Sequence, residues 1–292
     1  MYNRTTSYRI FTVINYILLT LVSISCILPL VHILAVSFSG SAPANANLVT
    51  LIPIDFNTDA YAKTFNNPNF HRALLIGIER TLLGTVVSMV LLSLAAYALS
   101  KDSHGFRSRS FYTWFFLFTM LFSGGIVPSY MLIRNLHLMN TIWALVLPVA
   151  INVFNMVLMM NFFRAVPKDL EEAALLDGAG HFRTLILVYL PVSMPAIATI
   201  SLFTMVSHWN SWFDGLLYIS DYRKYPLSTF LQTIIVQQDF NKINADVNEL
   251  QNISQRTVKA AQIFIGMLPI ILVYPFLQRY FVKGIILGAV KE

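Results

Sequence analysis

The sequence predicts an all-α protein that crosses a membrane six times. Of its 292 residues, 56% are hydrophobic and only 12% are charged, whereas ordinary soluble domains carry about 25% charged residues. Six apolar stretches are also long enough to cross a bilayer core of roughly 30 Å as helices. Helices are expected because backbone exposed to lipid must satisfy its own hydrogen bonds, and a barrel would show shorter segments of alternating polarity.

The six expected spans divide a chain that should form one transmembrane domain, 1–292. Their approximate limits are 11–37, 81–99, 112–132, 142–163, 185–206 and 260–277.

The first span could instead be a signal peptide, since Arg4 and Arg9 precede it. Its apolar stretch is much longer than the roughly 7–15 residues of a signal core, so an uncleaved helix is expected.

The distribution of basic residues predicts the orientation. With six spans both termini lie on one side, and the segments on that side hold 11 Lys and Arg among 57 residues. The segments on the other side, including a long external loop at 208–259, hold 9 among 104. Basic residues concentrate on the cytoplasmic side of membrane proteins. Both termini and the loop 164–184 are therefore expected in the cytoplasm, and the net charge of +6 requires no nucleic-acid partner.

No catalytic, metal or cofactor site is evident in the sequence. It contains neither the phosphate-binding G-x-x-x-x-G-K-[ST] pattern nor the G-x-S-x-G and H-E-x-x-H patterns of hydrolases. The single cysteine, Cys26, excludes an intramolecular disulfide, and the six histidines form no close pair. The expected spans hold no Asp or Glu, which proton relays commonly use. An active transporter without a phosphate-binding loop or a proton relay would need energy from a partner.

A polar block lies between the fourth and fifth spans. Pro167 suits the first position of a helix, and Asp169, Glu171 and Glu172 follow near the end where the helix dipole favours negative charge. Gly178 can end that helix in a left-handed conformation. The sequence therefore predicts a short cytoplasmic helix, a turn, and a second helix that enters the membrane. The alternative is a solvated turn without a partner, because Glu and Ala are good helix formers.

The block resembles a motif of ABC importer membrane subunits, E-A-A-x3-G-x9-I-x-L-P. The matching residues are Glu172-Ala173-Ala174, Gly178 and Val188-Tyr189-Leu190-Pro191. Val188 replaces the usual Ile, and the triplet Asp177-Gly178-Ala179 is also usual in that family. The pattern precedes the second-last span, as it does in the family.

Further stretches resemble permeases of carbohydrate importers of the maltose type. They are Phe122–Pro128, Asn140–Pro148, Trp209–Trp212 and Gln278–Gly284. Within that group the chain resembles the shorter partner of a heterodimeric pair, in a subgroup that handles complex oligosaccharides, including acidic ones of the alginate type.

The resemblance implies a mechanism and partners. The short helix would dock on a cytoplasmic ATPase dimer that holds ATP and Mg²⁺, while an external solute-binding protein would deliver an oligosaccharide to this chain and a second permease subunit in the bacterial inner membrane. The residues implied in coupling are Glu171, Glu172, Ala173, Ala174, Asp177, Gly178, Ala179, Leu190 and Pro191.

Two groups of residues are candidates for the substrate path. Asn155 and Asn161 lie in the fourth span, where hydrogen bonding between helices is the alternative role. Trp209, Asn210 and Trp212 lie near the external interface, where an aromatic belt is the alternative.

The sequence leaves other functions open. A secondary transporter would be expected to show intramembrane acids and inverted repeats, and neither is evident. A membrane enzyme would need a catalytic constellation. Permeases for peptides and amino acids share the cytoplasmic motif, so the motif alone does not identify the substrate.

Overall fold

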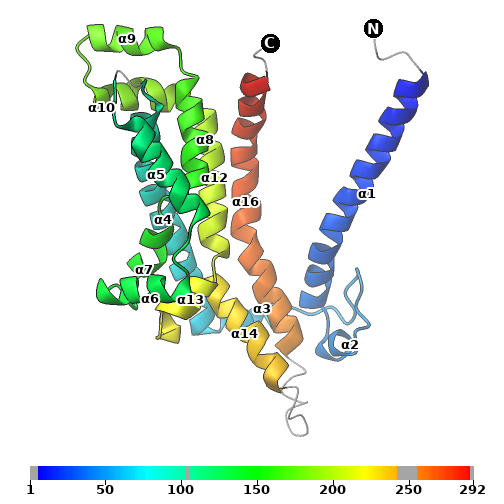
Figure 1. The fold of residues 1–292 in the computed structure, drawn as a ribbon. Coiled ribbons are helices and arrows are strands. Elements are labelled where there is room, and N and C mark those ends of the chain that lie inside the picture. Colours follow the sequence, from blue (N-terminus) through cyan, green and yellow to red (C-terminus); the bar gives the residue numbers. More distant parts are fainter. Residues whose placement is uncertain (1–5, 103–104, 242–254, 290–292) are drawn as a thin grey trace. The chain divides into compact units, whose positions relative to one another are not determined.

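A computed structural model describes residues 6–102, 105–241 and 255–289, and every regular element in this part of the chain is a helix. The chain folds as two compact units (Figure 1). Unit 1 comprises Met1–His71 and Thr233–Leu268, and unit 2 comprises Arg72–Gln232 and Pro269–Glu292. The predicted all-α fold is confirmed.

Unit 1 contains a long apolar helix whose side chains are almost all exposed. Helix α1 (Thr6–Ser37) includes the first predicted span, and none of its most apolar stretch is buried. Only its last residues pack, where Ala35 and Val36 join a small core near the short helix α2 (Ser41–Asn45). A second short helix, α3 (Asp59–Phe65), precedes α4. A bare apolar helix of this length suits contact with lipid or with another apolar helix.

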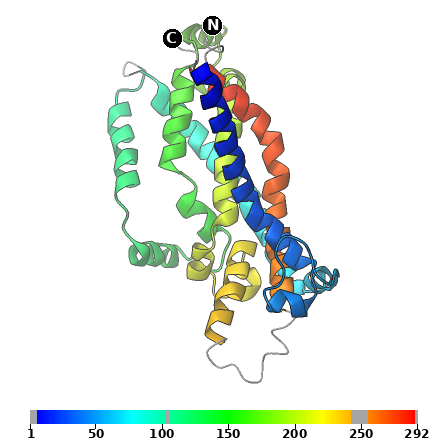
Figure 2. The same cartoon turned by 90° about the vertical axis from the view of Figure 1, so that its right-hand side faces the viewer.

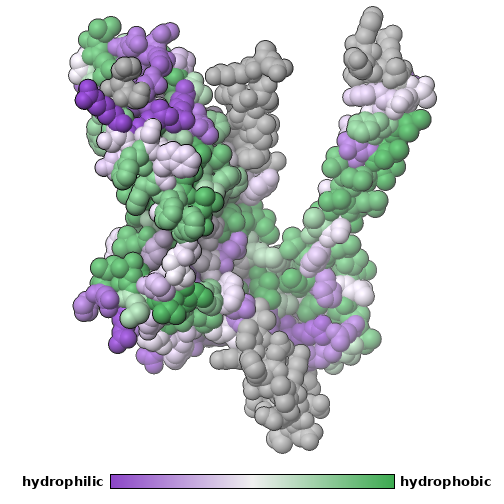
Figure 3. All heavy atoms as spheres, viewed as in Figure 1, coloured by the Kyte–Doolittle hydropathy of each residue, from purple (hydrophilic) through white to green (hydrophobic). Residues whose placement is uncertain are grey.

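Unit 2 is a bundle built around α4 (Pro68–Ser100), α8 (Val153–Arg164) and α12 (Met194–Asn210) (Figure 2). Its core mixes large aliphatic, sulfur-containing and aromatic side chains from these helices. The fully buried members include Leu92, Ala96, Met156, Met159, Phe163 and Ile200. Figure 3 shows hydrophilic side chains at the two ends of unit 2 and a hydrophobic band between them, which is the pattern of a membrane-spanning bundle.

Among the described residues, three helices could each cross a membrane, namely α1, α4 and the part of α16 (Gln255–Ala289) at Arg256–Pro275. Three further candidates are pairs of helices bent at a short break. The predicted count of six is reached when each pair is one span.

The third predicted span, 112–132, is not one helix. Helix α5 (Arg109–Leu121) and helix α6 (Ile126–Asn135) meet at 116°. Gly125 lies at the break with φ +86°, a conformation that favours glycine. The Ser-Gly-Gly sequence therefore interrupts the helix and turns the chain sharply.

The fourth and fifth predicted spans are bent as well. Residues Trp143–Val149, which form α7 (Trp143–Val146) and η2 (Leu147–Val149), meet α8 at 53°. The fifth span begins as α10 (His181–Thr184), continues through a π-helical segment η3 (Leu185–Tyr189) and α11 (Leu190–Val192), and then bends by 86° into α12.

The predicted external segment 208–259 is partly helical. It contains α13 (Phe213–Tyr218), a turn of 3-10 helix η4 (Tyr222–Lys224) and α14 (Leu227–Asn241). Its stretch 242–254 lies outside the described residues.

Candidate functional site

The polar block folds as predicted into a short helix, α9 (Lys168–Leu176), followed by a turn and a second helix. One detail differs, because Pro167 precedes the first helical residue. With ψ 132° it has the extended conformation of a capping position, and Lys168 begins the helix. Asp169 and Glu171 lie in the first turn, where the helix dipole stabilises negative charge.

The end of α9 is a Schellman motif centred on Gly178. The Ala179 N–H donates to the Ala174 carbonyl at 2.9 Å, and the Gly178 N–H donates to the Leu175 carbonyl at 3.0 Å. Gly178 has φ +80°, and a Cβ built there would meet no atom within 4 Å. The glycine is thus required by its left-handed conformation and not by crowding.

One side of α9 and the following turn is open and partly apolar. Leu176 is 89% exposed, and Leu170, Leu175 and Phe182 are exposed too. The predicted coupling residues Glu172, Ala173 and Asp177 lie beside these side chains and are also exposed. Large apolar side chains gathered at a polar end of the molecule are typical of a binding surface.

The other side of α9 holds Glu171, which faces the bundle. Its carboxylate forms an ion pair with Lys101, which directly follows α4. The Tyr189 hydroxyl donates to Glu171 Oε2 at 2.6 Å, and Lys101 Nζ donates to the Tyr189 hydroxyl at 3.1 Å. Lys101 Nζ also lies 4.0 Å from the ring centre of Tyr97 and 4.3 Å from that of Tyr189. We call Lys101, Glu171 and Tyr189 the polar triad.

Burial and hydrogen bonding shift the pKa values of Glu171 and Lys101 in opposite directions. Burial raises the pKa of Glu171. The hydrogen bonds from Lys101 and Tyr189 and the nearby positive charge together lower it by more than burial raises it, so the pKa lies below its ordinary value. Burial lowers the pKa of Lys101, and its bond to Glu171 partly opposes this. The carboxylate is therefore ionised at neutral pH.

The remaining motif residues lead into the fifth span. Leu190 and Pro191 begin α11, directly after the π-helical segment that carries Tyr189. Pro191 and Pro195 flank Ser193, where the 86° bend occurs. A proline removes a helical hydrogen bond, which favours a bend at this position.

A cavity of about 590 Å³ lies between α4, α5, η2, α8 and α12, and we call it the polar cavity because polar side chains line it beside a larger apolar part of the wall. None of its described lining side chains is acidic or is Lys or Arg. Its polar lining residues are Ser88, Thr119, Asn152, Asn155, Thr204, Ser207 and His208. Hydroxyl, amide and imidazole groups of this kind can donate to and accept from a hydroxyl-rich ligand.

The predicted substrate-path residues divide between different environments. Asn155 lines the polar cavity, and its Nδ2 lies 3.5 Å from Thr204 Oγ1 on α12, so it also joins two helices. Asn161 is exposed on α8 and does not line that cavity. Asn210 and Trp212 are exposed at the end of α12.

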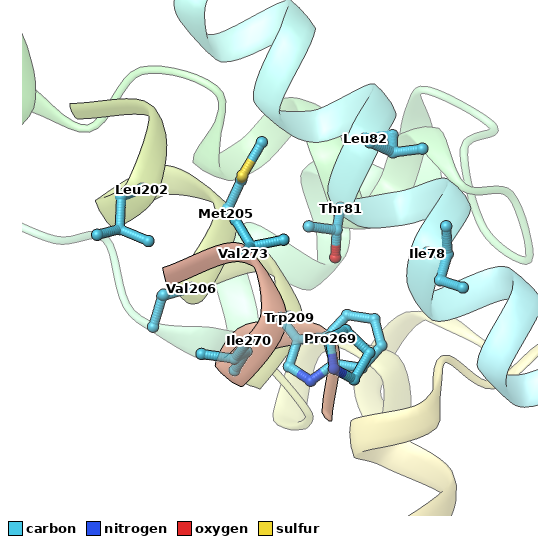
Figure 4. A pocket seen from close by; sticks show the side chains of 10 residues that line it. All are labelled: Ile78, Thr81, Leu82, Leu202, Met205, Val206, Trp209, Pro269, Ile270 and Val273. Atoms are coloured by element: carbon cyan, nitrogen blue, oxygen red, sulfur yellow. The ribbon is translucent and has the colours of Figure 1, made fainter. Parts of the chain in front are cut away.

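Trp209 lines a second, smaller space of about 150 Å³ between α4, α12 and α16 (Figure 4). Aliphatic side chains such as Leu82 and Ile270 form most of its walls, and the Thr81 hydroxyl donates within its own helix to the Gly77 carbonyl. This space suits an apolar group better than a sugar.

His208 was not singled out from the sequence, yet it lines the polar cavity and is almost fully buried. Its ring lies against Gly84 on α4, where a Cβ would approach the ring to 2.6 Å. The sequence shows only a histidine two positions after the fifth predicted span, and its contact with Gly84 becomes visible in the fold.

A buried ion pair at the end of unit 2 away from α9 was also not predicted from the sequence. Arg80 on α4 is completely buried and pairs with Asp214 on α13. It also donates to the Ser211 carbonyl at 2.9 Å and lies 3.5 Å from the Leu145 carbonyl. An available signal was that opposite charges stand next to the ends of two apolar spans.

Residues 103–287 match the family model of the binding-protein-dependent transport system inner membrane component. The chain belongs to this family. The permease is 39% identical to the polygalacturonan/rhamnogalacturonan transport system permease protein YtcP of Bacillus subtilis, over 97% of this chain and 99% of the relative. It is 38% identical to protein LplC of the same organism, over 99% of this chain and 97% of the relative.

A solved structure supports the same assignment. A chain of a bacterial ABC transporter involved in the import of the acidic polysaccharide alginate superposes with a TM-score of 0.84 at 32% identity, covering 95% of this permease and 98% of that chain. The resemblance to ABC importer permeases is therefore confirmed, and the protein is an integral inner membrane transport subunit.

Proposed function

We propose that this permease forms half of the translocation pathway of an ATP-driven importer for oligosaccharides. An external solute-binding protein delivers the substrate, and a second permease subunit completes the path. The proposal rests on α9, an exposed helix at a polar end of the bundle that ends in the Schellman motif at Gly178. This helix presents the motif that importer permeases carry.

In this proposal α9 docks on a cytoplasmic ATPase dimer, which holds ATP and Mg²⁺. Leu175 and Leu176 supply apolar contact area, and Glu172 offers an exposed carboxylate for a basic partner group. The permease itself contributes no nucleotide site, because the sequence holds no phosphate-binding loop.

The substrate class is proposed from the cavity and from the relatives. Uncharged polar groups such as Ser88, Asn152 and Asn155 line a space of about 590 Å³. Hydroxyl groups of a sugar can hydrogen-bond to them, and the described lining has no carboxylate that would repel an acidic sugar. Two relatives are named for polygalacturonan/rhamnogalacturonan and for alginate. An acidic oligosaccharide is therefore the proposed substrate.

The test is uptake by the reconstituted importer with its solute-binding protein. We expect a uronate oligosaccharide to be accumulated, and a dipeptide at the same concentration not to be. A neutral oligosaccharide of equal length should be taken up at least about tenfold more slowly. Equal uptake of the neutral sugar would remove the acidic preference, and uptake of the dipeptide alone would refute the sugar assignment.

The orientation gives a separate prediction for intact cells. A cysteine at Arg223, exposed in η4, should react with a membrane-impermeant thiol reagent in a Cys26→Ser background. A cysteine at Ser110, exposed near the start of α5, should react only after permeabilisation. The opposite pattern of labelling would invert the proposed topology.

A further inference from the structure

We infer that Glu171 is a positioning residue that transmits movement of α9 to the transmembrane bundle through Lys101 and Tyr189. This inference rests on the proposed function, because it assigns a task within ATP-driven transport. It separates two neighbouring carboxylates. Glu172 is exposed toward the proposed ATPase, whereas the Glu171 side chain faces the bundle and is only 18% exposed.

The geometry of the polar triad makes it a junction of several helices. Glu171 accepts from Lys101 and from Tyr189, and Lys101 also donates to Tyr189, so each member bonds to both others. The Tyr189 ring packs edge-on against Tyr97 of α4 at 4.9 Å and Phe163 of α8 at 5.6 Å between ring centres. A displacement of Glu171 therefore acts on α4, α8 and the start of the fifth span together.

Apart from the chain that links it to α8 and α10, helix α9 is joined to the bundle mainly by polar side chains. No residue of α9 is buried, so apolar packing holds it only weakly. A second ion pair, Lys168 with Asp102 at 2.6 Å, joins the same two segments. Its side chains are 74% and 63% exposed, whereas those of Lys101 and Glu171 are 15% and 18% exposed. Solvent weakens exposed pairs much more than buried ones.

Tyr189 lies in a part of the fifth span that is close to its bend. It is the last residue of the π-helical segment, four positions before the break at Ser193. π-Helical turns occur frequently at functional sites in helices. Glu171 is thus connected directly to the part of the span whose helical geometry is already interrupted.

The experiment uses the complete importer in proteoliposomes, and it measures uptake and ATP hydrolysis in the same sample. Glu171→Gln removes the charge and preserves the shape of the side chain. We expect this variant to bind the ATPase as wild type does, but to transport at least about tenfold less substrate per ATP hydrolysed. Lys101→Met should give the same loss of coupling.

The matched control is Asp102→Asn, the same carboxylate-to-amide change in the exposed ion pair. Its transport per ATP should stay within about twofold of wild type. Exchanging the charges in Lys101→Glu/Glu171→Lys should recover part of the coupling, since the pair is restored in reverse.

Two results would overturn the inference. Wild-type transport per ATP in Glu171→Gln would show that the triad transmits nothing. Loss of ATPase binding in Glu171→Gln, with normal binding in Asp102→Asn, would show that Glu171 contacts the ATPase itself. Failure of the proposed function would look different, because the wild-type importer would then take up no oligosaccharide when ATP is supplied.

Discussion

Replacing Arg80 by Met is expected to destabilise the permease strongly. Arg80 is fully buried, pairs with Asp214 and donates to the Ser211 carbonyl, so its loss removes the cation paired with Asp214 and one of the donors to that carbonyl. Removing one member of a buried ion pair typically costs about 3–5 kcal/mol. In detergent, Arg80→Met should unfold at a clearly lower temperature than wild type and yield less monodisperse protein.

The adjacent residue supplies a matched control for that prediction. Glu79 is exposed on the same helix, and Glu79→Gln should unfold as wild type does. The double variant Arg80→Met/Asp214→Leu should recover part of the stability, because no unpaired charge remains. If Arg80→Met were as stable as Glu79→Gln, the ion pair would not hold this end of the bundle together.

Changing Gly178 to Val is expected to uncouple the permease from its ATPase while leaving it in the membrane. Gly178 has φ +80°, which a β-branched residue adopts only with strain, at a cost of about 1 kcal/mol or more. That cost is too small to unfold the bundle, but it displaces α9. Substrate-stimulated ATP hydrolysis in the reconstituted complex should fall at least about tenfold.

Two further variants separate backbone geometry from side-chain contact. Gly178→Asn should retain most activity, since asparagine tolerates the left-handed conformation and the site has room for a Cβ. Glu172→Lys should also reduce coupling about tenfold, because it reverses an exposed charge on the proposed docking surface. Ser110→Ala, outside α9, should have little effect. Normal coupling in Gly178→Val and Glu172→Lys would make the block a solvated turn.

Features set by neighbouring residues could be predicted from the sequence. The composition and apolar stretches predicted a membrane-spanning helical fold, and Gly178 predicted the left-handed end of α9. The bend near Pro191 was also predictable, because proline removes a helical hydrogen bond wherever it lies. The predicted start of α9 at Pro167 was wrong by one residue, since a proline suits either the capping position or the first turn.

Features that depend on distant residues could not be predicted in this way. Arg80 and Asp214 are 134 positions apart, and Lys101 and Glu171 are 70 apart. A single sequence shows each charge but not its partner. The 116° turn between α5 and α6 depends likewise on packing, because glycine permits a bend without setting its angle.

The source of energy for uptake tests the central claim most directly. Proteoliposomes holding the complete importer, with its solute-binding protein and a labelled uronate oligosaccharide outside, can be loaded with ATP and Mg²⁺ or given a proton or sodium gradient. The permease has no acidic residue in its expected spans, and its sequence contains no phosphate-binding G-x-x-x-x-G-K-[ST] pattern. We therefore predict accumulation with ATP inside and none with either gradient alone. Accumulation driven by a gradient without ATP would contradict the account and indicate a secondary transporter.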